Sequence, residues 1–434
     1  MNTAANISLD EKLLADFELA KELDLTLGSM RSKAFEKFRA IGIPSKKNEE
    51  YKYAPFDRII NDAYVQQLFP EKIIAPETLE NILINHTYAD SIKLVFINGI
   101  INADLSDIEL IEKGLNIKTF QEYSANHKIV TQSALQETKD PFALLNGSFA
   151  NHRMVIELIE NVALTKSIHL IFISNSSEQV LMHNKIAIVI GNHSKANFIE
   201  THLSVNSAES ISNHFVEFFI GSEAKVNHVL VQDNGDKLIE INNTFANLDK
   251  HSVFNTHTFS FSGKIIRNNL NILLNAPECE ASLYGFYHPS AEELMDNHTL
   301  VDHRMPHCLS NELYKGVIED HGTAVFNGKV YVRPDAQKTN AYQSNKNILL
   351  GAASVVNTKP QLEIYADDVK CSHGSSTGFI DDESLFYLQS RGIGKERAKA
   401  LLLYAYAAEL LNNIEIESAK ILIEQKLAAL FGYE

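Results

Sequence analysis

A turn followed by apolar residues at alternate positions recurs through the middle of the chain. Each unit has a turn, a small or polar residue and a short alternating run, as in residues 192–198 (NHSKANF) and 222–228 (SEAKVNH). The matched positions lie 30, 27, 28, 43 and 31 residues apart, and they are Ser194, Ala224, His251, Cys279, Gly322 and Ala353. The near-constant interval limits the folds that this region can adopt.

A strand repeat near thirty residues without intervening helices is typical of a β-solenoid, in which each coil stacks on the previous one. It does not fit a βαβ sheet. A sandwich or a cupin-like double-stranded barrel would show similar short strands, and the regular interval is what favours the solenoid. We attribute the long interval between Cys279 and Gly322 to an insertion.

Helical patterns flank this region. Apolar residues at three- and four-residue spacings predict helices over 10–23 and 29–41, and Pro76 begins a shorter one over 76–86. Strand-like runs start near Lys93, and after Asp381 three helices are expected, over 384–391, 395–414 and 417–432. The predicted domains are therefore a helical domain over 1–92, a β-solenoid over 93–380 and a helical domain over 381–434.

The middle C-terminal helix, which contains ALLLYAYAAELL, is apolar around much of its circumference. Such a helix must bury its outer face in its own core or on a partner. The same run contains Glu409 and is too short to span a bilayer, so no membrane association is expected.

Charge and cysteine content exclude several classes of function. The net charge of -16 would repel a phosphate backbone, and no Lys/Arg block offsets it, so nucleic acid is a poor candidate ligand. The N-terminus has no basic start or apolar stretch of a signal peptide. The three cysteines form no disulfide framework and are expected to be reduced, which favours a cytoplasmic location.

The chemistry concentrates between Glu363 and Ile393. Cys371 and His373 lie two residues apart, so on a strand both side chains project from the same face. A thiolate and an imidazole suit zinc, copper(I) or iron-sulfur species, but two ligands cannot close a four-coordinate site. Alternatively, Cys371 is a small apolar strand residue and His373 a turn residue.

Farther along the same segment, the acidic residues 381–383 suit a helix N-terminus.

A second concentration of ligand-type residues is the segment HTLVDHRMPHC, which contains His298, His303, His307 and Cys308. No fixed zinc signature is present, and Pro306 interrupts the strand. We favour structural hydrogen bonds by these imidazoles. The rival hypothesis is a metal-dependent enzyme that uses the three histidines on a cupin-like barrel.

Other signals of catalysis are missing from the sequence. No Walker A, dinucleotide-binding or nucleophile-elbow motif occurs. Cys279 occupies the small-residue position of the repeat, where a packing role is expected. The residues by themselves thus predict a β-solenoid with helical ends and one incomplete ligand pair.

Three long segments resemble one protein family. Residues 362–393 (LEIYADDVKCSHGSSTGFIDDESLFYLQSRGI), residues 296–332 (DNHTLVDHRMPHCLSNELYKGVIEDHGTAVFNGKVYV) and residues 31–56 (RSKAFEKFRAIGIPSKKNEEYKYAPF) are similar to the SufB/SufD family of the SUF iron-sulfur cluster assembly system. Two features match the SufD branch. SufB sequences have a cysteine after Phe-Tyr, where this chain has Leu388, and lack the Cys371-Ser372-His373 segment.

The resemblance implies a right-handed parallel β-helix between helical domains, and a SufB–SufD heterodimer that engages two copies of the ATPase SufC. It assigns SufC docking to the C-terminal helices, where we select Arg397, Leu401, Leu402, Tyr404 and Ala405 as contact residues. It also implies that His373 faces a SufB cysteine and helps to hold a nascent cluster or iron, with Cys371 as a second candidate. No tightly bound cofactor is expected in the isolated chain.

These inferences predict a non-catalytic scaffold subunit. Self-association is a third possibility besides the scaffold and the enzyme, because an uncapped solenoid edge can pair with a copy of itself. The isolated chain would then be a homodimer.

Overall fold

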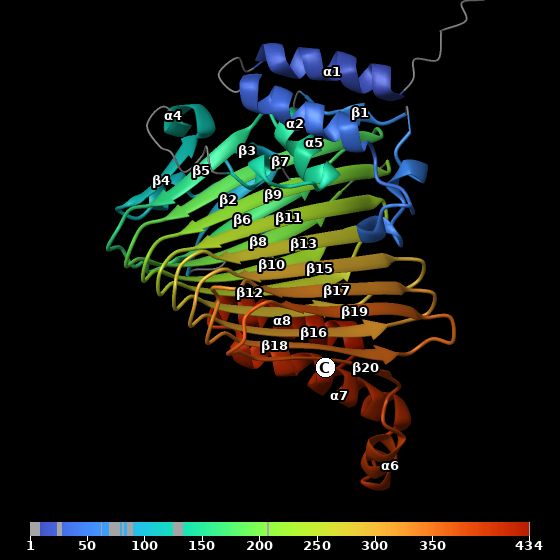
Figure 1. Cartoon of the computed structure of the whole chain (residues 1–434). Helices are drawn as coiled ribbons and strands as arrows, with labels where there is room; N and C mark the ends of the chain where they lie inside the picture. The colour runs from blue at the N-terminus through green and yellow to red at the C-terminus, as the bar shows by residue number, and fades with distance from the viewer. Residues whose placement is uncertain are drawn as a thin grey trace, which may run out of the picture.

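The computed structural model describes residues 9–23, 28–61, 63–68, 79, 82–84, 90–124, 133–205 and 208–433. The described residues form a flattened solenoid of two stacked parallel sheets, with helices packed on the outer faces (Figure 1). The chain alternates between the sheets, so each coil contributes one strand to each sheet. The predicted mainly β fold with a parallel β-solenoid and helical ends is confirmed.

The first sheet, sheet A, runs in the order β4, β5, β7, β9, β11, β13, β15, β17, β19, with β1 beside β7. Its strands are β1 Val65–Gln66, β4 Leu115–Thr119, β5 Arg153–Leu158, β7 Val180–Ile190, β9 Ser210–Ile220, β11 Leu238–Leu248, β13 Ile265–Leu274, β15 Leu294–His303, β17 Thr323–Val332 and β19 Val355–Ile364.

The second sheet, sheet B, runs in the order β3, β2, β6, β8, β10, β12, β14, β16, β18, β20. Its strands are β2 Ser91–Ile97, β3 Ile100–Ile101, β6 Ser167–Ser174, β8 Lys195–Ser204, β10 Lys225–Asp233, β12 Val253–Ser262, β14 Glu280–Tyr287, β16 Leu309–Ile318, β18 Asn340–Leu349 and β20 Lys370–Gly378. The pairings at the start of the solenoid, β2 with β3 and β4 with β5, are antiparallel.

The strand register corrects the expected insertion. Glu280 of β14 pairs with Leu309 of β16, so the coil after Cys279 begins at Cys308. Gly322 precedes β17, which belongs to the other sheet. The interval between Cys279 and Gly322 is therefore one full coil plus the crossing to sheet A, and it holds no insertion. Turns followed by small residues precede the strands of both sheets. The six matched positions therefore precede strands of sheet B as far as Cys279 and strands of sheet A from Gly322 onward.

The interior between the sheets is largely apolar. Inward-facing residues such as Leu170, Phe198, Val226 and Phe254 form one continuous buried cluster along the solenoid. Cys279 and Cys308 are both fully buried in it, so the packing role predicted for Cys279 is confirmed. Apolar burial of this extent supplies the main stabilisation of the coils.

The N-terminal helices cover the outer face of sheet A. They are α1 Leu9–Leu23, α2 Gly28–Ile41 and α5 Pro141–Phe149, and Phe35 and Phe149 join a cluster with Ile211 and Ile239 of the sheet. Residues 46–58 form turns, including the 3-10 helices Glu49–Tyr51 and Phe56–Arg58. Most of the helix predicted over 76–86 lies outside the described residues. Shorter helical elements are α4 Phe120–Ser124 and the 3-10 helices Ile108–Leu110 and Ala134–Gln136.

The C-terminal helices lie beside sheet B, and the last two cover its outer face. They are α6 Asp382–Ser390, α7 Lys395–Ala408 and α8 Glu417–Phe431, with the 3-10 helix Glu409–Asn413 between the last two. Leu403 of α7 and Leu422 of α8 pack with Val229 and Phe259 of the sheet. Helix α6 instead extends beyond the last coil (Figure 1). The apolar middle helix therefore buries part of its surface within its own chain.

Candidate functional site

Cys371 and His373 lie on β20, the last strand of sheet B. In the register of the strands, Cys371 pairs with Ala341 and His373 with Gln343 of β18. Ala341 and Gln343 are buried, so these positions belong to the inward-facing columns of the solenoid. The two candidate ligands therefore share one face, as the spacing predicts, and that face is the interior of the last coil.

The last coil is open. β19 ends sheet A and β20 ends sheet B, so within the described residues no strand pairs with their outer edges. As a result His373 is exposed, although it occupies an interior column, and Cys371 is half-buried. The described residues bring no third ligand to this pair, since their three-ligand cluster lies elsewhere.

The environment distinguishes the two candidates. Cys371 packs beside Ala341, Ala366 and Val369 in a small apolar cluster. Burial raises the pKa of the Cys371 thiol, which disfavours the thiolate that binds metals. His373 has no such cover. His373 is therefore the more accessible of the two candidate side chains.

Helix α6 follows this strand directly. Asp381 is its N-cap, and its carboxylate accepts a hydrogen bond from the Ser384 N–H at 2.9 Å. Asp382 and Glu383 occupy the first turn, where negative charge complements the helix dipole. Leu388 is half-buried on this helix. The predicted helix start is confirmed, and it ties α6 to the strand that carries His373.

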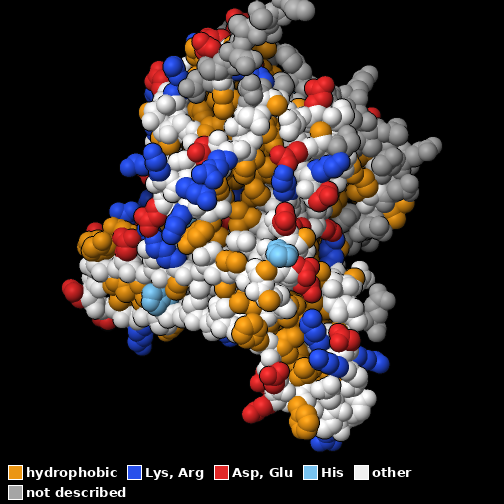
Figure 2. Space-filling view, turned by 90° about the vertical axis from the view of Figure 1, so that its right-hand side faces the viewer, with side chains coloured by type: hydrophobic (Ala, Val, Ile, Leu, Met, Phe, Trp, Pro, Cys, Tyr) orange, Lys and Arg blue, Asp and Glu red, His pale blue; other side chains and the backbone are white. Residues whose placement is uncertain are grey.

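Large apolar side chains are exposed near the open coil. Phe379 is 77% exposed and Phe386 72%, and the others in this region are Tyr342, Val355, Ile364, Tyr365 and Tyr387. In Figure 2 hydrophobic side chains appear on the lower arm of the molecule, where Figure 1 places α6. We call these seven residues the open-end surface. Exposed apolar groups gathered in this way are typical of interaction surfaces.

The residues selected for ATPase docking lie on α7. Arg397 and Ala405 are exposed, whereas Leu401, Leu402 and Tyr404 are half-buried. Tyr404 stacks on Tyr433 with ring centroids 4.6 Å apart. Arg397 also lines a cavity of about 500 Å³ between α7 and the end of α8.

The structure does not bring His298, His303 and His307 together. His298 faces outward beside Glu50, whose carboxylate is 3.0 Å from its Nδ1, and it lines a cavity of about 400 Å³. His303 is buried and its Nε2 lies 2.9 Å from the Ser310 hydroxyl. His307 is an exposed turn residue with a φ of 62°. The first two make structural hydrogen bonds. The parallel coils also differ from the antiparallel barrel that the rival enzyme hypothesis requires.

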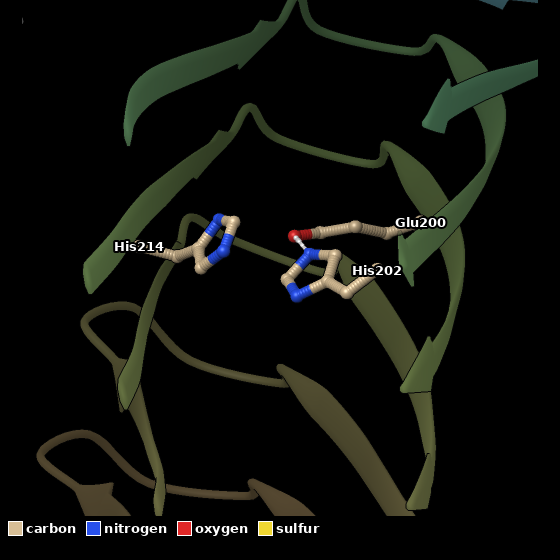
Figure 3. Close-up of side chains that lie close together, drawn as sticks. All are labelled: Glu200, His202 and His214. Carbon is tan, nitrogen blue, oxygen red and sulfur yellow. Dashed lines mark hydrogen bonds and ion pairs between the residues drawn. The ribbon is translucent and has the colours of Figure 1, made fainter. Parts of the chain in front are cut away.

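A cluster that the sequence did not predict lies inside the solenoid (Figure 3). Glu200 and His202 project from β8 of sheet B, and His214 projects toward them from β9 of sheet A. One potential ligand atom from each residue lies within 4.8 Å of the other two. All three side chains are buried.

Hydrogen bonds connect this cluster to neighbouring coils. His202 Nε2 donates to Glu200 Oε1 and His202 Nδ1 donates to Glu240 Oε1, both at 2.7 Å. His228 Nε2 lies 3.2 Å from the second oxygen of Glu200. The His214 ring stacks on His202 with centroids 4.1 Å apart. We call these five residues the interior cluster.

The electrostatics of the interior cluster are strongly coupled. Burial alone would lower the pKa of His202, but the Glu240 and Glu200 carboxylates outweigh it and raise the pKa to about 10. Burial and the neighbouring His202 lower the pKa of His214 to about 3. Burial would raise the pKa of both glutamates, but hydrogen bonds and the charge of His202 lower it. His202 is therefore an imidazolium held between two carboxylates.

One sequence signal for this cluster was available. Glu200 and His202 lie two residues apart, directly after the alternating run 192–198, and have the same spacing as Cys371 and His373. The sequence could not show that His214 joins Glu200 and His202. The spacing of strands within one sheet does not tell which residues of the two sheets face each other across the interior.

Two further observations bear on the class of protein. No helix in the described ranges is long and apolar enough to cross a membrane. The three cysteines are free thiols. The fold defines the class as a parallel β-solenoid protein with helical regions on both outer faces. Histidine, cysteine and carboxylate side chains lie in its interior and at its open end.

Comparison with known proteins identifies the family. Residues 172–406 match the family model described as SUF system FeS cluster assembly, SufBD core domain, and residues 17–170 match the SufBD protein N-terminal region. The chain therefore belongs to the SufBD family of iron-sulfur cluster assembly proteins, and it is SufD-like.

Individual relatives agree with this assignment. The iron-sulfur cluster assembly protein SufD of Escherichia coli is 31% identical over 383 residues, which cover 87% of each chain. An iron-sulfur cluster assembly SufBD family protein of Synechocystis is 26% identical and covers 91% of this chain and 89% of the relative. The chloroplastic protein ABCI7 of Arabidopsis thaliana is 26% identical, with 94% and 86% covered.

Proposed function

We propose that this chain is a non-catalytic scaffold subunit that pairs with a SufB-type subunit, docks the SufC ATPase and supplies part of the site on which iron-sulfur clusters are assembled. The observation that carries the proposal is an incomplete ligand pair, Cys371 and His373, on the unpaired last coil of a solenoid. A pair that cannot close a four-coordinate site needs ligands from a second chain.

The open coil supports pairing with another solenoid. The outer edges of β19 and β20 present free backbone donors and acceptors, which are a template for further strands. The open-end surface adds exposed aromatic groups, such as Phe379 and Phe386, around these edges. Aromatic residues of this kind are enriched in the buried centres of protein interfaces.

His373 is the main ligand in this proposal. It is exposed in an interior column, so a partner coil stacked on β20 would cover it and bring its own ligands to the same column. Cys371 is the second ligand, and partner binding or a metal ion would have to favour its thiolate. The iron or cluster is the cargo of this site, and the isolated chain is proposed to hold none of it tightly.

The C-terminal helices would transmit the action of the ATPase. Arg397, Leu401, Leu402, Tyr404 and Ala405 of α7 form the proposed SufC contact, and α7 packs against α6, which continues from β20. ATP-driven closure of two SufC copies would strain helices 395–431 and shift the seam between the two solenoids. His373 would then become accessible to iron or cluster.

Two subsidiary points belong to the same proposal. In the absence of a SufB-type partner, the open coil would accept a second copy of this chain, giving a homodimer.

The free thiols of Cys279, Cys308 and Cys371 fit a reducing compartment, and we place the protein in the cytoplasm.

Co-expression with SufB and SufC tests the proposal. A tagged full-length chain should retain both proteins through affinity purification and gel filtration. A chain that purifies alone from cells containing both partners would contradict it. Size measurement of the chain without partners distinguishes a homodimer from a monomer.

A further inference from the structure

Inside the solenoid, facing strands bring together a ligand set that lies far from the open coil. Glu200 and His202 of β8 and His214 of β9 point toward one another across the interior, as Figure 3 shows. Two imidazoles and one carboxylate form a common donor set for divalent first-row transition metals. The three residues therefore have the composition and the convergence of a metal site.

The contacts around these three residues resemble the outer shell of a metal site. Glu240 accepts from Nδ1 of His202, which orients the ring so that Nε2 faces Glu200. His228 holds the other oxygen of Glu200 and is itself held by the Thr256 hydroxyl at 3.0 Å. Carboxylates and hydroxyls in these positions orient metal ligands and raise their basicity.

His214 is oriented in the same manner. Its Nε2 lies 2.8 Å from the Ser212 hydroxyl, and the Asn184 amide lies 3.2 Å from its Nδ1. Each ring nitrogen thus has a polar neighbour that fixes the plane of the imidazole. One of these hydrogen bonds must be given up when a ring nitrogen binds an ion.

Charge balance favours a divalent ion. Glu200 and Glu240 place two negative charges in an interior where uncompensated charge is costly. Their side-chain hydrogen bonds come from His202, His228, Gln232 and Asn234. An ion with two positive charges bound between Glu200 and Nε2 of His202 would neutralise both carboxylates, and Nδ1 of His202 would still donate to Glu240.

We propose that Glu200, His202 and His214 bind one divalent first-row transition-metal ion inside the solenoid. Metal–ligand distances of about 2.1 Å require the Glu200 oxygen and His202 nitrogen to separate from 2.7 Å to about 3.0 Å at octahedral angles or about 3.4 Å at tetrahedral angles. Imidazole nitrogens bind a metal in the plane of the ring, and the stacked rings of His202 and His214 lie only 19° from parallel. Binding therefore also requires the His214 ring to turn about its side-chain torsions and to bring one nitrogen toward Glu200 and His202. The site is separate from Cys371 and His373 and requires no partner chain.

Cobalt(II) is a suitable probe because its visible spectrum reports the ligand types. The full-length chain is produced in medium supplemented with cobalt, so that the ion can enter before the solenoid closes, and is then freed of loose metal by gel filtration. About one cobalt per chain should remain, with a spectrum of nitrogen and oxygen ligands and no thiolate-to-cobalt band. Absence of retained cobalt in the wild-type chain would overturn the proposal.

Matched variants locate the ion. Glu200→Gln and His214→Gln should each lower the retained cobalt by at least about tenfold. His303→Gln is the control, because His303 is also buried and its Nε2 lies 2.9 Å from the Ser310 hydroxyl, away from the cluster. His373→Ala should retain the cobalt as well. Loss in both control variants, or retention in both cluster variants, would contradict the assignment.

A measurement on the wild-type chain keeps the proposal testable if the cluster variants fold poorly. Anomalous diffraction at the cobalt edge from crystals of the cobalt-grown protein should show one peak between Glu200, His202 and His214. A peak at another position, or none, would indicate that these residues form only a charged hydrogen-bond network.

Discussion

His373 lies directly beside Gln343 in the register of the last two strands of sheet B. Gln343 is buried because a further coil covers it, whereas His373 occupies the same column with no coil above it. A partner coil stacked on β20 would bury His373 in the same way. This relationship explains how an inward-facing residue can be available to a second chain.

Glu312, Gln343 and His373 occupy the same inward-facing position on successive strands of sheet B, and the carboxyl group of Glu312 has an unusually high pKa. Burial raises the pKa of Glu312 to about 7, although hydrogen bonds from Thr299 and Gln343 oppose the shift. Since the folded state holds this proton more tightly than the unfolded state, stability should fall as pH rises from about 4.5 through 7. Glu312→Gln should remove this fall and raise the free energy of unfolding at pH 8 by on the order of 3 kcal/mol.

Denaturant unfolding at several pH values measures this effect. Gln at 312 can accept from Gln343 and donate to the Thr299 hydroxyl, so the variant keeps both contacts. Glu280→Gln, at an exposed position of β14, should leave the pH dependence unchanged. An unaltered slope in Glu312→Gln would show that this group does not hold a proton in the folded state.

The C-terminal helices should depend on their contact with sheet B. Ile423 of α8 is fully buried in the cluster with Val229 and Phe259. Ile423→Ala should lower the free energy of unfolding by about 2–4 kcal/mol, because it leaves a cavity in this contact. Ile421→Ala, on the same helix but 45% exposed, should change it by less than about 0.5 kcal/mol. Equal effects of the two substitutions would mean that α8 is not docked as described.

The proposed docking of SufC can be tested on α7. Arg397 is exposed beside the cavity between α7 and α8, so Arg397→Glu should weaken SufC binding by about tenfold or more, about 1.4 kcal/mol. Binding of SufB should be unchanged. Lys113→Glu makes the same charge change at an exposed position before β4 and is the control. Calorimetric titration with purified SufC gives both affinities, and identical values would place the contact elsewhere.

The open-end surface is tested on α6. Phe386 is 72% exposed, so Phe386→Asp should leave the thermal midpoint of the isolated chain unchanged and reduce recovery of the three-protein complex by about tenfold. Leu110→Asp, at a position 51% exposed near the other end of the solenoid, should have no effect on recovery. Full recovery with Phe386→Asp would remove this residue from the interface.

Part of the fold follows from local patterns in the sequence. Alternating apolar residues and a near-constant interval indicate stacked strands, and the acidic residues 381–383 indicate the start of α6. The sequence did not show which of the two sheets each turn leads into, because Cys279 and Gly322 occupy similar turns that precede strands of different sheets. Pairing across an interior depends on three-dimensional register, which a single sequence does not contain.

The candidate sites, like the fold, could be predicted from the sequence only where their residues share one strand. Cys371 and His373 share a strand, so their common face follows from their spacing, and the structure shows in addition that this face is the interior column of an open coil. The interior cluster joins two sheets and has no linear motif. His298, His303 and His307 show the opposite case, in which closeness in sequence does not produce a shared site.

Substitution of His373 in the purified three-protein complex tests the central claim most directly. His373→Ala should leave the complex assembled, since the exposed side chain packs against little of its own chain, and should abolish the accumulation of iron-sulfur cluster followed by its visible absorbance and iron content. His307→Ala, at another exposed histidine, should accumulate cluster like the wild type. Full cluster accumulation with His373→Ala would contradict the account.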